Sequence, residues 1–268
     1  MSAAPAPSRE NGPITALMYH AISAAGTPSG QDPHYTVAQE AFDQQLDTLG
    51  RTHSLGSARD WLQGARHDVL VTFDDGHISN YDLAFPALQQ RSMGADFFVN
   101  PALVGTDGFA TWAQLREMSD AGMSIQSHGY DHVYLTSLGE ERLRTTLRAA
   151  REEISQHMGK PATLLAPPGG RMPPRLAEIA RECGYTHVLS SRPGRIGGSS
   201  SSQRILPRMA ITANTSIDLL QAWTGDRQGP MLRERFRYGS LAFAKKLLGD
   251  TGYERVRARA LAVLRGSA

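Results

Sequence analysis

The stretch Val69-Leu70-Val71-Thr72-Phe73-Asp74-Asp75-Gly76 decides the fold class of this chain. Its first five residues are apolar or β-branched, which is typical of a strand that is buried on both faces. Two carboxylates and a glycine follow at once, so charged side chains stand at the end of the strand. In α/β enzymes this is where functional sites lie. Taken alone, Asp74-Asp75-Gly76 would fit a plain Asp-Gly turn better than a functional site.

Other apolar stretches of strand length alternate along the chain with segments of helical period. This alternation predicts strand and helix units that build a parallel sheet. We therefore expect an α/β fold, a distorted (β/α) barrel of about seven strands with a C-terminal helical tail. The further predicted strands are Ile14 to Tyr19, Ala95 to Val99, Met123 to Ser127, Thr163 to Ala166, Thr186 to Leu189 and Arg204 to Leu206.

The segments between these strands carry signals for the beginning and end of helices. From Ser137 to Gly159, apolar residues recur at spacings of three and four and predict one buried stripe. Ser137 and Glu140 form a capping-box pattern, and Gly159 is expected to end the helix. Further helices are predicted to begin at Thr36, at Thr111, at Pro173 or Pro174, and to cover Ile217 to Trp223. Ser191 to Gln203 has nothing to bury and predicts a flexible loop.

Composition suggests three parts, which are a disordered segment over residues 1–13, an α/β domain over 14–225 and a basic helical extension over 226–268. The first ten residues lack the apolar run of a secretory signal. No run of about 18 apolar residues occurs that could span a membrane. The single cysteine, Cys183, excludes an internal disulfide and fits a reducing compartment. We therefore expect a cytoplasmic protein.

The extension carries ten Lys or Arg against four acidic residues, a local balance of +6 in a chain of net charge +2. Such a tail could make weak contact with an anionic membrane surface, but a solvated helix face is the simpler interpretation. Tyr253 to Arg265 predicts an amphipathic helix whose apolar side packs on the barrel. We expect no nucleic-acid partner, and the sequence does not reveal the oligomeric state.

A second strand that ends in polar residues is Ser124 to Ser127, followed by His128-Gly129-Tyr130-Asp131-His132. Two imidazoles four residues apart would lie on one face of a helical turn and could bind one ion. Alone, each could be an ordinary hydrogen-bonded histidine. Together with Asp75, however, they make a three-ligand set that leaves positions for water and substrate, as in catalytic zinc sites.

These residues resemble a known family. Thr72 to Gly76 is similar to the first motif of the polysaccharide deacetylases (the NodB-homology domain, carbohydrate esterase family 4), and Ser127 to His132 is similar to the second. The resemblance covers roughly Ile14 to Arg208 and implies a distorted barrel that hydrolyses acetyl groups on glycans with a divalent metal, often zinc. It implies that Asp74 is the base and that Asp75, His128 and His132 bind the metal.

The third motif of the family departs from its usual form in Ala166-Pro167-Pro168-Gly169-Gly170. Ala166 stands in place of the arginine that would orient the base, and Gly169 in place of an aromatic residue. The resemblance implies an oxyanion role for the Gly169 N–H and places Pro168 beside the substrate. Arg171 is a candidate to replace the missing guanidinium and to contact substrate. An ordinary turn after a strand would explain the same residues.

The later motifs, including the histidine that supplies the general acid, are not recognisable. Leu206-Pro207-Arg208 occupies the comparable place and resembles a subgroup without that histidine. His20 ends the first predicted strand, so we expect it at the barrel mouth, as the acid or as a structural residue. His157 and His187 are expected to be structural, and His77 could border the pocket.

The sequence therefore predicts a metal-dependent hydrolase that removes N-acetyl groups from N-acetylated sugars of a glycan or glycan precursor. Three alternatives remain open, namely an O-acetyl esterase, a hydrolase of small amides and a catalytically inactive glycan-binding protein. Nothing in the sequence identifies the leaving group.

Overall fold

The structure is a computed structural model that describes residues 14–24, 31–197, 203–225 and 229–239. The chain forms two compact units, Met1–Asp226 and Arg227–Ala268. In the second unit, residues 229–239 are helical. The predicted helix from Tyr253 to Arg265 and the segment 1–13 lie outside the described residues. Within the described residues, no helix is both long enough and apolar enough to cross a membrane.

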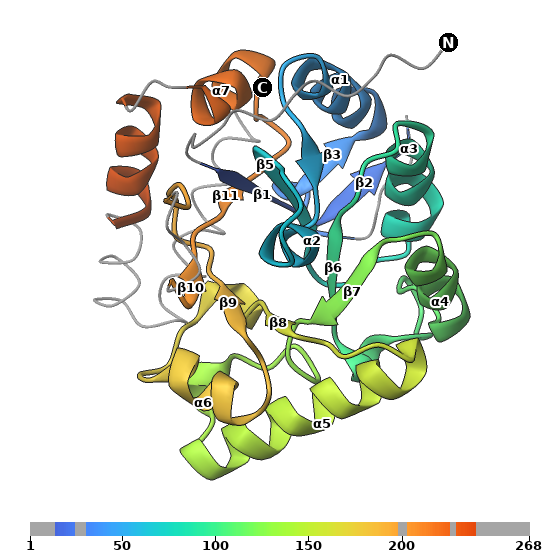
Figure 1. Cartoon of the computed structure of the whole chain (residues 1–268), viewed down its shortest axis with the longest axis vertical. Helices are drawn as coiled ribbons and strands as arrows, with labels where there is room; N and C mark the ends of the chain where they lie inside the picture. The colour runs from blue at the N-terminus through green and yellow to red at the C-terminus, as the bar shows by residue number, and fades with distance from the viewer. Residues whose placement is uncertain (1–13, 25–30, 198–202, 226–228, 240–268) are drawn as a thin grey trace, which may run out of the picture. The chain divides into compact units, whose positions relative to one another are not determined.

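A sheet of nine parallel strands forms the centre of the first unit (Figure 1). Its order is β10-β9-β8-β7-β6-β5-β1-β11, with β4 paired to the start of β5. The strands are β1 (Thr15–Tyr19), β4 (Leu55–Gly56), β5 (Val69–Phe73), β6 (Asp96–Val99), β7 (Ser124–Ser127), β8 (Leu164–Leu165), β9 (His187–Leu189), β10 (Ile205–Leu206) and β11 (Met209–Ala210). All seven predicted strands are present, and β4 and β11 were not expected. A small separate sheet pairs β2 (Ala21–Ser23) with β3 (Thr36–Ala38).

The two edges of the main sheet come close together. β10 and β11 lie at opposite ends of the strand order, yet only Pro207 and Arg208 separate them in the chain. Three residue steps span at most about 11 Å, so the sheet must curl. No ladder joins β10 to β11 within the described residues, which leaves a curled parallel half-barrel. The predicted α/β fold, a distorted barrel of parallel strands, is confirmed as a half-barrel with more strands than expected.

The strands are buried as the apolar stretches predict. Every residue of β1 and β5 is buried. Helices cover the outside of the sheet (Figure 1). Phe73 stacks between Tyr19 and Phe97, with ring centroids 5.3 and 4.8 Å apart. These ring contacts hold β1, β5 and β6 against one another at the carboxyl end of β5.

Five α-helices of the first unit lie in the predicted segments, namely α1 (Gln39–Gly50), α4 (Trp112–Asp120), α5 (Glu140–Met158), α6 (Leu176–Glu182) and α7 (Ile217–Thr224). The described residues also form α2 (Ala58–Leu62) and α3 (Phe85–Gln90), which were not expected. The apolar stripe of α5 is buried, and Gly159 ends that helix with a φ of 64°. The capping box expected from Ser137 is wrong. Gly139 precedes the helix, and the Ser137 hydroxyl donates to the carbonyl oxygen of Tyr134.

Two further expectations need correction. Thr36 lies in β3, and the helix begins three residues later at Gln39, because the segment first pairs with β2. The predicted loop from Ser191 to Gln203 does bury a side chain, since Ile196 is fully buried and exchanges backbone hydrogen bonds with Ile14. Residues 198–202 of that segment lie outside the described part of the chain.

Candidate active site

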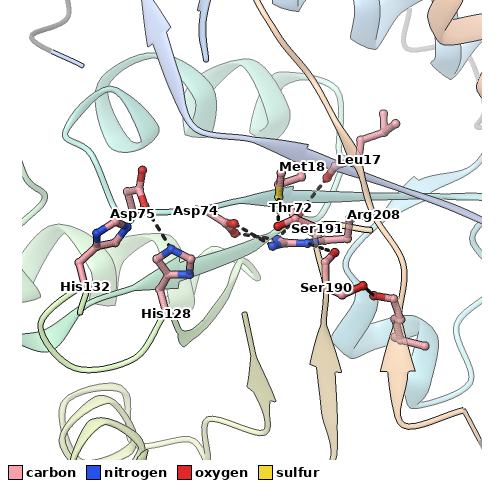
Figure 2. Close-up of polar contacts among 11 residues, drawn as sticks. Leu17, Met18, Thr72, Asp74, Asp75, His128, His132, Ser190, Ser191 and Arg208 are labelled. Atoms are coloured by element: carbon pink, nitrogen blue, oxygen red, sulfur yellow. Dashed lines mark hydrogen bonds and ion pairs between the residues drawn. The ribbon is translucent and has the colours of Figure 1, made fainter. Parts of the chain in front are cut away.

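Five polar side chains follow the carboxyl ends of four parallel strands. His20 follows β1, Asp74 and Asp75 follow β5, His128 follows β7, and Arg208 follows β10. Because the strands are parallel, these ends meet at one mouth of the half-barrel. Sequence-distant residues are thereby brought together at a single place (Figure 2).

The predicted metal ligands converge. The Oδ1 atom of Asp75 lies 3.2 Å from Nε2 of His128 and 3.2 Å from Nε2 of His132. One ligand atom from each of the three residues lies within 4.8 Å of the others. Two ligands held about 2.1 Å from a tetrahedral zinc ion are about 3.4 Å apart, so this spacing fits a divalent metal. A carboxylate oxygen and two imidazole nitrogens are also the donors that zinc accepts.

Electrostatics keep the Asp75 ligand ionised. Burial raises the pKa of the Asp75 carboxyl, but hydrogen bonds from His128 and His132 more than offset this, so its pKa lies well below the usual value. The same contact raises the pKa of His132, although partial burial opposes it. Competition between protons and a metal at this site therefore involves the imidazole of His132 more than the carboxylate of Asp75.

The local backbone differs from the predicted helical turn. His128 and His132 lie on a loop, and His132 has a φ of 61°. Asp75 has a φ of 77°, so two of the three candidate ligands adopt a left-handed conformation that side chains disfavour. Gly76 follows with a φ of 74°, and a Cβ there would lie 3.0 Å from Cγ1 of Val99. The Asp-Asp-Gly sequence thus fits a tight turn that aims adjacent carboxylates in different directions.

Asp74 faces away from the metal ligands and pairs with Arg208 (Figure 2). Two parallel hydrogen bonds of 2.7 and 2.8 Å join the guanidinium to both carboxylate oxygens. The side chain of Arg208 is fully buried, and it also donates to Thr72 Oγ1 and to the carbonyl oxygen of Ser190. Burial raises the pKa of Asp74. The positive charge of Arg208, and then that of His128, lower this pKa by more than burial raises it, so the net pKa is below the usual value.

Arg208 is the site residue that the sequence interpretation missed. We expected Arg171 to replace the guanidinium absent at Ala166, but the guanidinium of Arg171 lies 5.1 Å from the ring centroid of Tyr134. The available signal was a single arginine within the apolar run Ile205 to Ile211. An arginine so placed must find a buried partner, and Asp74 is that partner.

His20 lies at the barrel mouth as expected. The Asn80 side chain donates to its backbone carbonyl at 2.7 Å, and its ring packs on Tyr35 with centroids 4.6 Å apart. Burial lowers the pKa of His20, while Asp75 and then Asp74 raise it less strongly. Its buried Nδ1 has no hydrogen-bond partner among the described residues. These features place a neutral imidazole beside the carboxylates, and its role in catalysis stays a prediction.

The remaining candidates lie close to the site or in structural positions. Pro168 lies against the loop that carries His128 and His132. A Cβ on Gly129 in that loop would be 3.3 Å from Cγ of Pro168. Gly169 is exposed, and the oxyanion role of its N–H stays a prediction. His77 is buried and contacts Ser79 Oγ at 2.8 Å. Two other histidines have structural surroundings, since His157 stacks on Trp112 and His187 lies within β9.

Comparison with known proteins agrees with this geometry. Residues 63–188, which include both ligand motifs and the third motif, match the profile of the family described as polysaccharide deacetylase. This part of the chain is similar to the polysaccharide deacetylase family. One relative in this family is YxkH of Bacillus subtilis, which is named as a polysaccharide deacetylase. It is 28% identical over 66% of this chain and 64% of its own length, so the match spans just under two thirds of YxkH.

More distant members of the polysaccharide deacetylase family extend the comparison. The poly-β-1,6-N-acetyl-D-glucosamine N-deacetylase of Staphylococcus aureus is 21% identical over 81% of this chain and 84% of its own length. Among solved structures, IcaB of Ammonifex degensii is 26% identical, with a TM-score of 0.68 over 81% of this chain and 98% of IcaB. The deacetylase PplD of Streptococcus pyogenes has a TM-score of 0.72 over 81% of this chain and all of PplD, at 24% identity, which supports the fold.

Proposed function

We propose that this chain is a metal-dependent hydrolase that removes N-acetyl groups from N-acetylated sugars of a glycan or glycan precursor. The observation that carries the proposal is the placement of the Asp75-His128-His132 ligand set beside the buried Asp74–Arg208 pair. Such a pairing of an open metal site with a separate carboxylate suits hydrolysis by an activated water. The names of the Staphylococcus aureus relative and of YxkH support the choice of substrate.

We propose zinc as the metal. Held by Asp75, His128 and His132, a zinc ion would act as a Lewis acid and lower the pKa of water to about 7. The remaining work falls to side chains of the protein. Asp74 accepts the proton of the attacking water, and two of its lone-pair sites remain for this task because Arg208 uses only two. Arg208 keeps Asp74 ionised and fixes its orientation.

Proton delivery to the leaving group is assigned to His20. Because burial lowers the pKa of its imidazole, His20 takes up the proton that the attacking water gives to Asp74 and passes it to the sugar nitrogen. Water adds its oxygen to the acetyl carbonyl carbon, the C–N bond breaks, and the sugar nitrogen receives a proton to leave as the amine, with acetate as the second product. The N–H of Gly169 would donate to the oxygen of the tetrahedral intermediate. One such donor contributes about 10²–10³ in rate.

Acetate release from metal-stripped protein, with divalent metals added back one at a time, tests this function. N-acetylated oligosaccharides, an O-acetylated glycan and small N-alkyl acetamides serve as substrates. We expect zinc to restore release from the N-acetylated oligosaccharides, and His132→Ala to lose most of the metal, because three ligands leave little redundancy. Release from only the O-acetylated glycan or only the small amides would favour the corresponding alternative hydrolase. Bound metal without any hydrolysis would favour a binding protein.

A further inference from the structure

Tyr134 occupies a position on the rim of the site that the proposed reaction does not use. It stands two residues after the ligand candidate His132, on the loop that follows β7. A Cβ on Gly169 would lie only 2.6 Å from Cε1 of the Tyr134 ring, so the ring fills the space that a side chain at position 169 would need. Gly169 also has a φ of 60°, which disfavours other residues. The loops after β7 and β8 therefore fit together around this ring.

The ring is held in place yet remains accessible. The guanidinium carbon of Arg171 lies 5.1 Å from the ring centroid, a distance at which a cation and an aromatic face attract each other. Even so, 38% of Tyr134 is exposed, so the residue remains partly open to solvent. A fixed, exposed aromatic side chain beside a reactive centre loses little conformational entropy when it binds a ligand.

We propose that Tyr134 is a sugar-binding platform that receives the unit next to the one whose acetyl group is removed. The C–H groups along one side of a pyranose ring pack well on an aromatic surface, whose faces carry negative charge. In this arrangement an isolated N-acetyl sugar or a small amide lacks the neighbouring unit that would pack on the platform. The substrate class is therefore an oligosaccharide or polymer. The inference rests on the proposed function only in taking the Asp75-His128-His132 site as the reacting centre.

The test compares long and short substrates in the metal-loaded, full-length protein. Pentasaccharides of N-acetylglucosamine in β-1,4 and β-1,6 linkage are the long probes, and 4-nitrophenyl acetate is the short one. Tyr134→Ala should raise KM for the accepted pentasaccharide about tenfold, the size expected for losing one aromatic contact, with little change in kcat. Turnover of 4-nitrophenyl acetate should not change. Tyr134→Phe should behave like the unchanged protein, because the ring is retained.

Val133→Ala is the matched control, since Val133 is the neighbouring residue and is similarly exposed, at 40%. It should leave KM for both kinds of substrate unchanged. An unchanged KM for the pentasaccharide in Tyr134→Ala, or an equal loss on both substrates, would overturn the platform. Direct titration of the pentasaccharides separates this result from failure of the proposed function. Binding that depends on Tyr134 without acetate release would keep the platform and reject the deacetylase, whereas no binding by the unchanged protein would reject the platform.

Discussion

Asp74 and Asp75 are neighbours in the chain, but their surroundings divide them into different roles. Asp75 contacts two imidazoles, while Asp74 is 2% exposed and pairs with an arginine. The division arises at the turn after β5, where a φ of 77° at Asp75 separates the directions of the two side chains. The proposed metal ligand and the proposed proton acceptor therefore come from one dipeptide.

The first prediction concerns this division of roles. Asp74→Asn should retain the metal while kcat falls by ~10²–10⁴, because the amide cannot accept the proton of water. Asp75→Asn should lose most of the metal, because one of only three ligands is weakened. Metal content by elemental analysis and acetate release, measured on the same samples, check both outcomes. Equal loss of metal in the two variants would show that the roles are wrongly assigned.

The second prediction concerns the buried ion pair. Arg208→Met leaves the Asp74 charge buried without its partner, so the free energy of unfolding should fall by about 3–5 kcal/mol. Adding Asp74→Asn to Arg208→Met should recover part of that loss, because the unpaired charge is removed. Chemical denaturation of metal-stripped protein measures both changes.

Arg171→Met is the matched control for this experiment. Arg171 is half-buried and its cation lies over an aromatic ring, so its loss should cost only about 1 kcal/mol. If Arg208→Met were no more destabilising than Arg171→Met, or if Asp74→Asn gave no recovery, the pair would not have the energetic role assigned to it.

At the scale of elements, the polar residues at the carboxyl ends of the strands form the candidate site. A polar residue at the amino end of β6 instead contributes to stability. Asp96 begins β6, is fully buried, and accepts hydrogen bonds from the backbone N–H groups of Ala58 and Arg59 at the start of α2. Burial raises the pKa of its carboxyl to about 6, although hydrogen bonds from Ser124 and these amides oppose the shift. One carboxyl thus joins α2 to the centre of the sheet.

The third prediction follows from this raised pKa. Between the unfolded pKa of about 3.9 and the folded value, the folded state binds more protons than the unfolded state. The contribution of Asp96 to stability is therefore fully present below pH 4 and is lost as the pH rises through about 6. The Asn side chain does not titrate, so the unfolding free energy of the unchanged protein relative to Asp96→Asn should fall by about 2 kcal/mol from pH 4 to 7.

Denaturant titrations of both proteins, stripped of metal, measure this difference at each pH. Constant effects of the substitution cancel, because only the change with pH is compared. A difference that stays constant, or that rises with pH, would mean that Asp96 has an ordinary or lowered pKa in the folded protein.

At the scale of the whole molecule, the fourth prediction concerns the basic extension. The sequence predicts an amphipathic helix over Tyr253 to Arg265, in a region outside the described residues, that packs on the barrel. Deleting residues 250–268 should lower the melting temperature while the folded protein still releases acetate, because the site belongs to the first unit. Sedimentation with anionic vesicles is the opposing measurement. Salt-sensitive binding that disappears on deletion, with no change in melting temperature, would identify a membrane-surface anchor.

The sequence by itself determined seven of the nine strands of the main sheet, the fold class and the candidate metal-ligand set, because each is recorded locally. Apolar runs predict buried strands, and Asp75, His128 and His132 stand directly after two of them. Only the tertiary structure decided what orients Asp74. Arg208 lies 134 residues away and reaches Asp74 because the curled sheet brings the β10–β11 connection across to β5. The position of Tyr134 against Gly169 likewise depends on how two loops pack, since contacts between distant segments arise from the curvature of the sheet and leave no periodic pattern in the sequence.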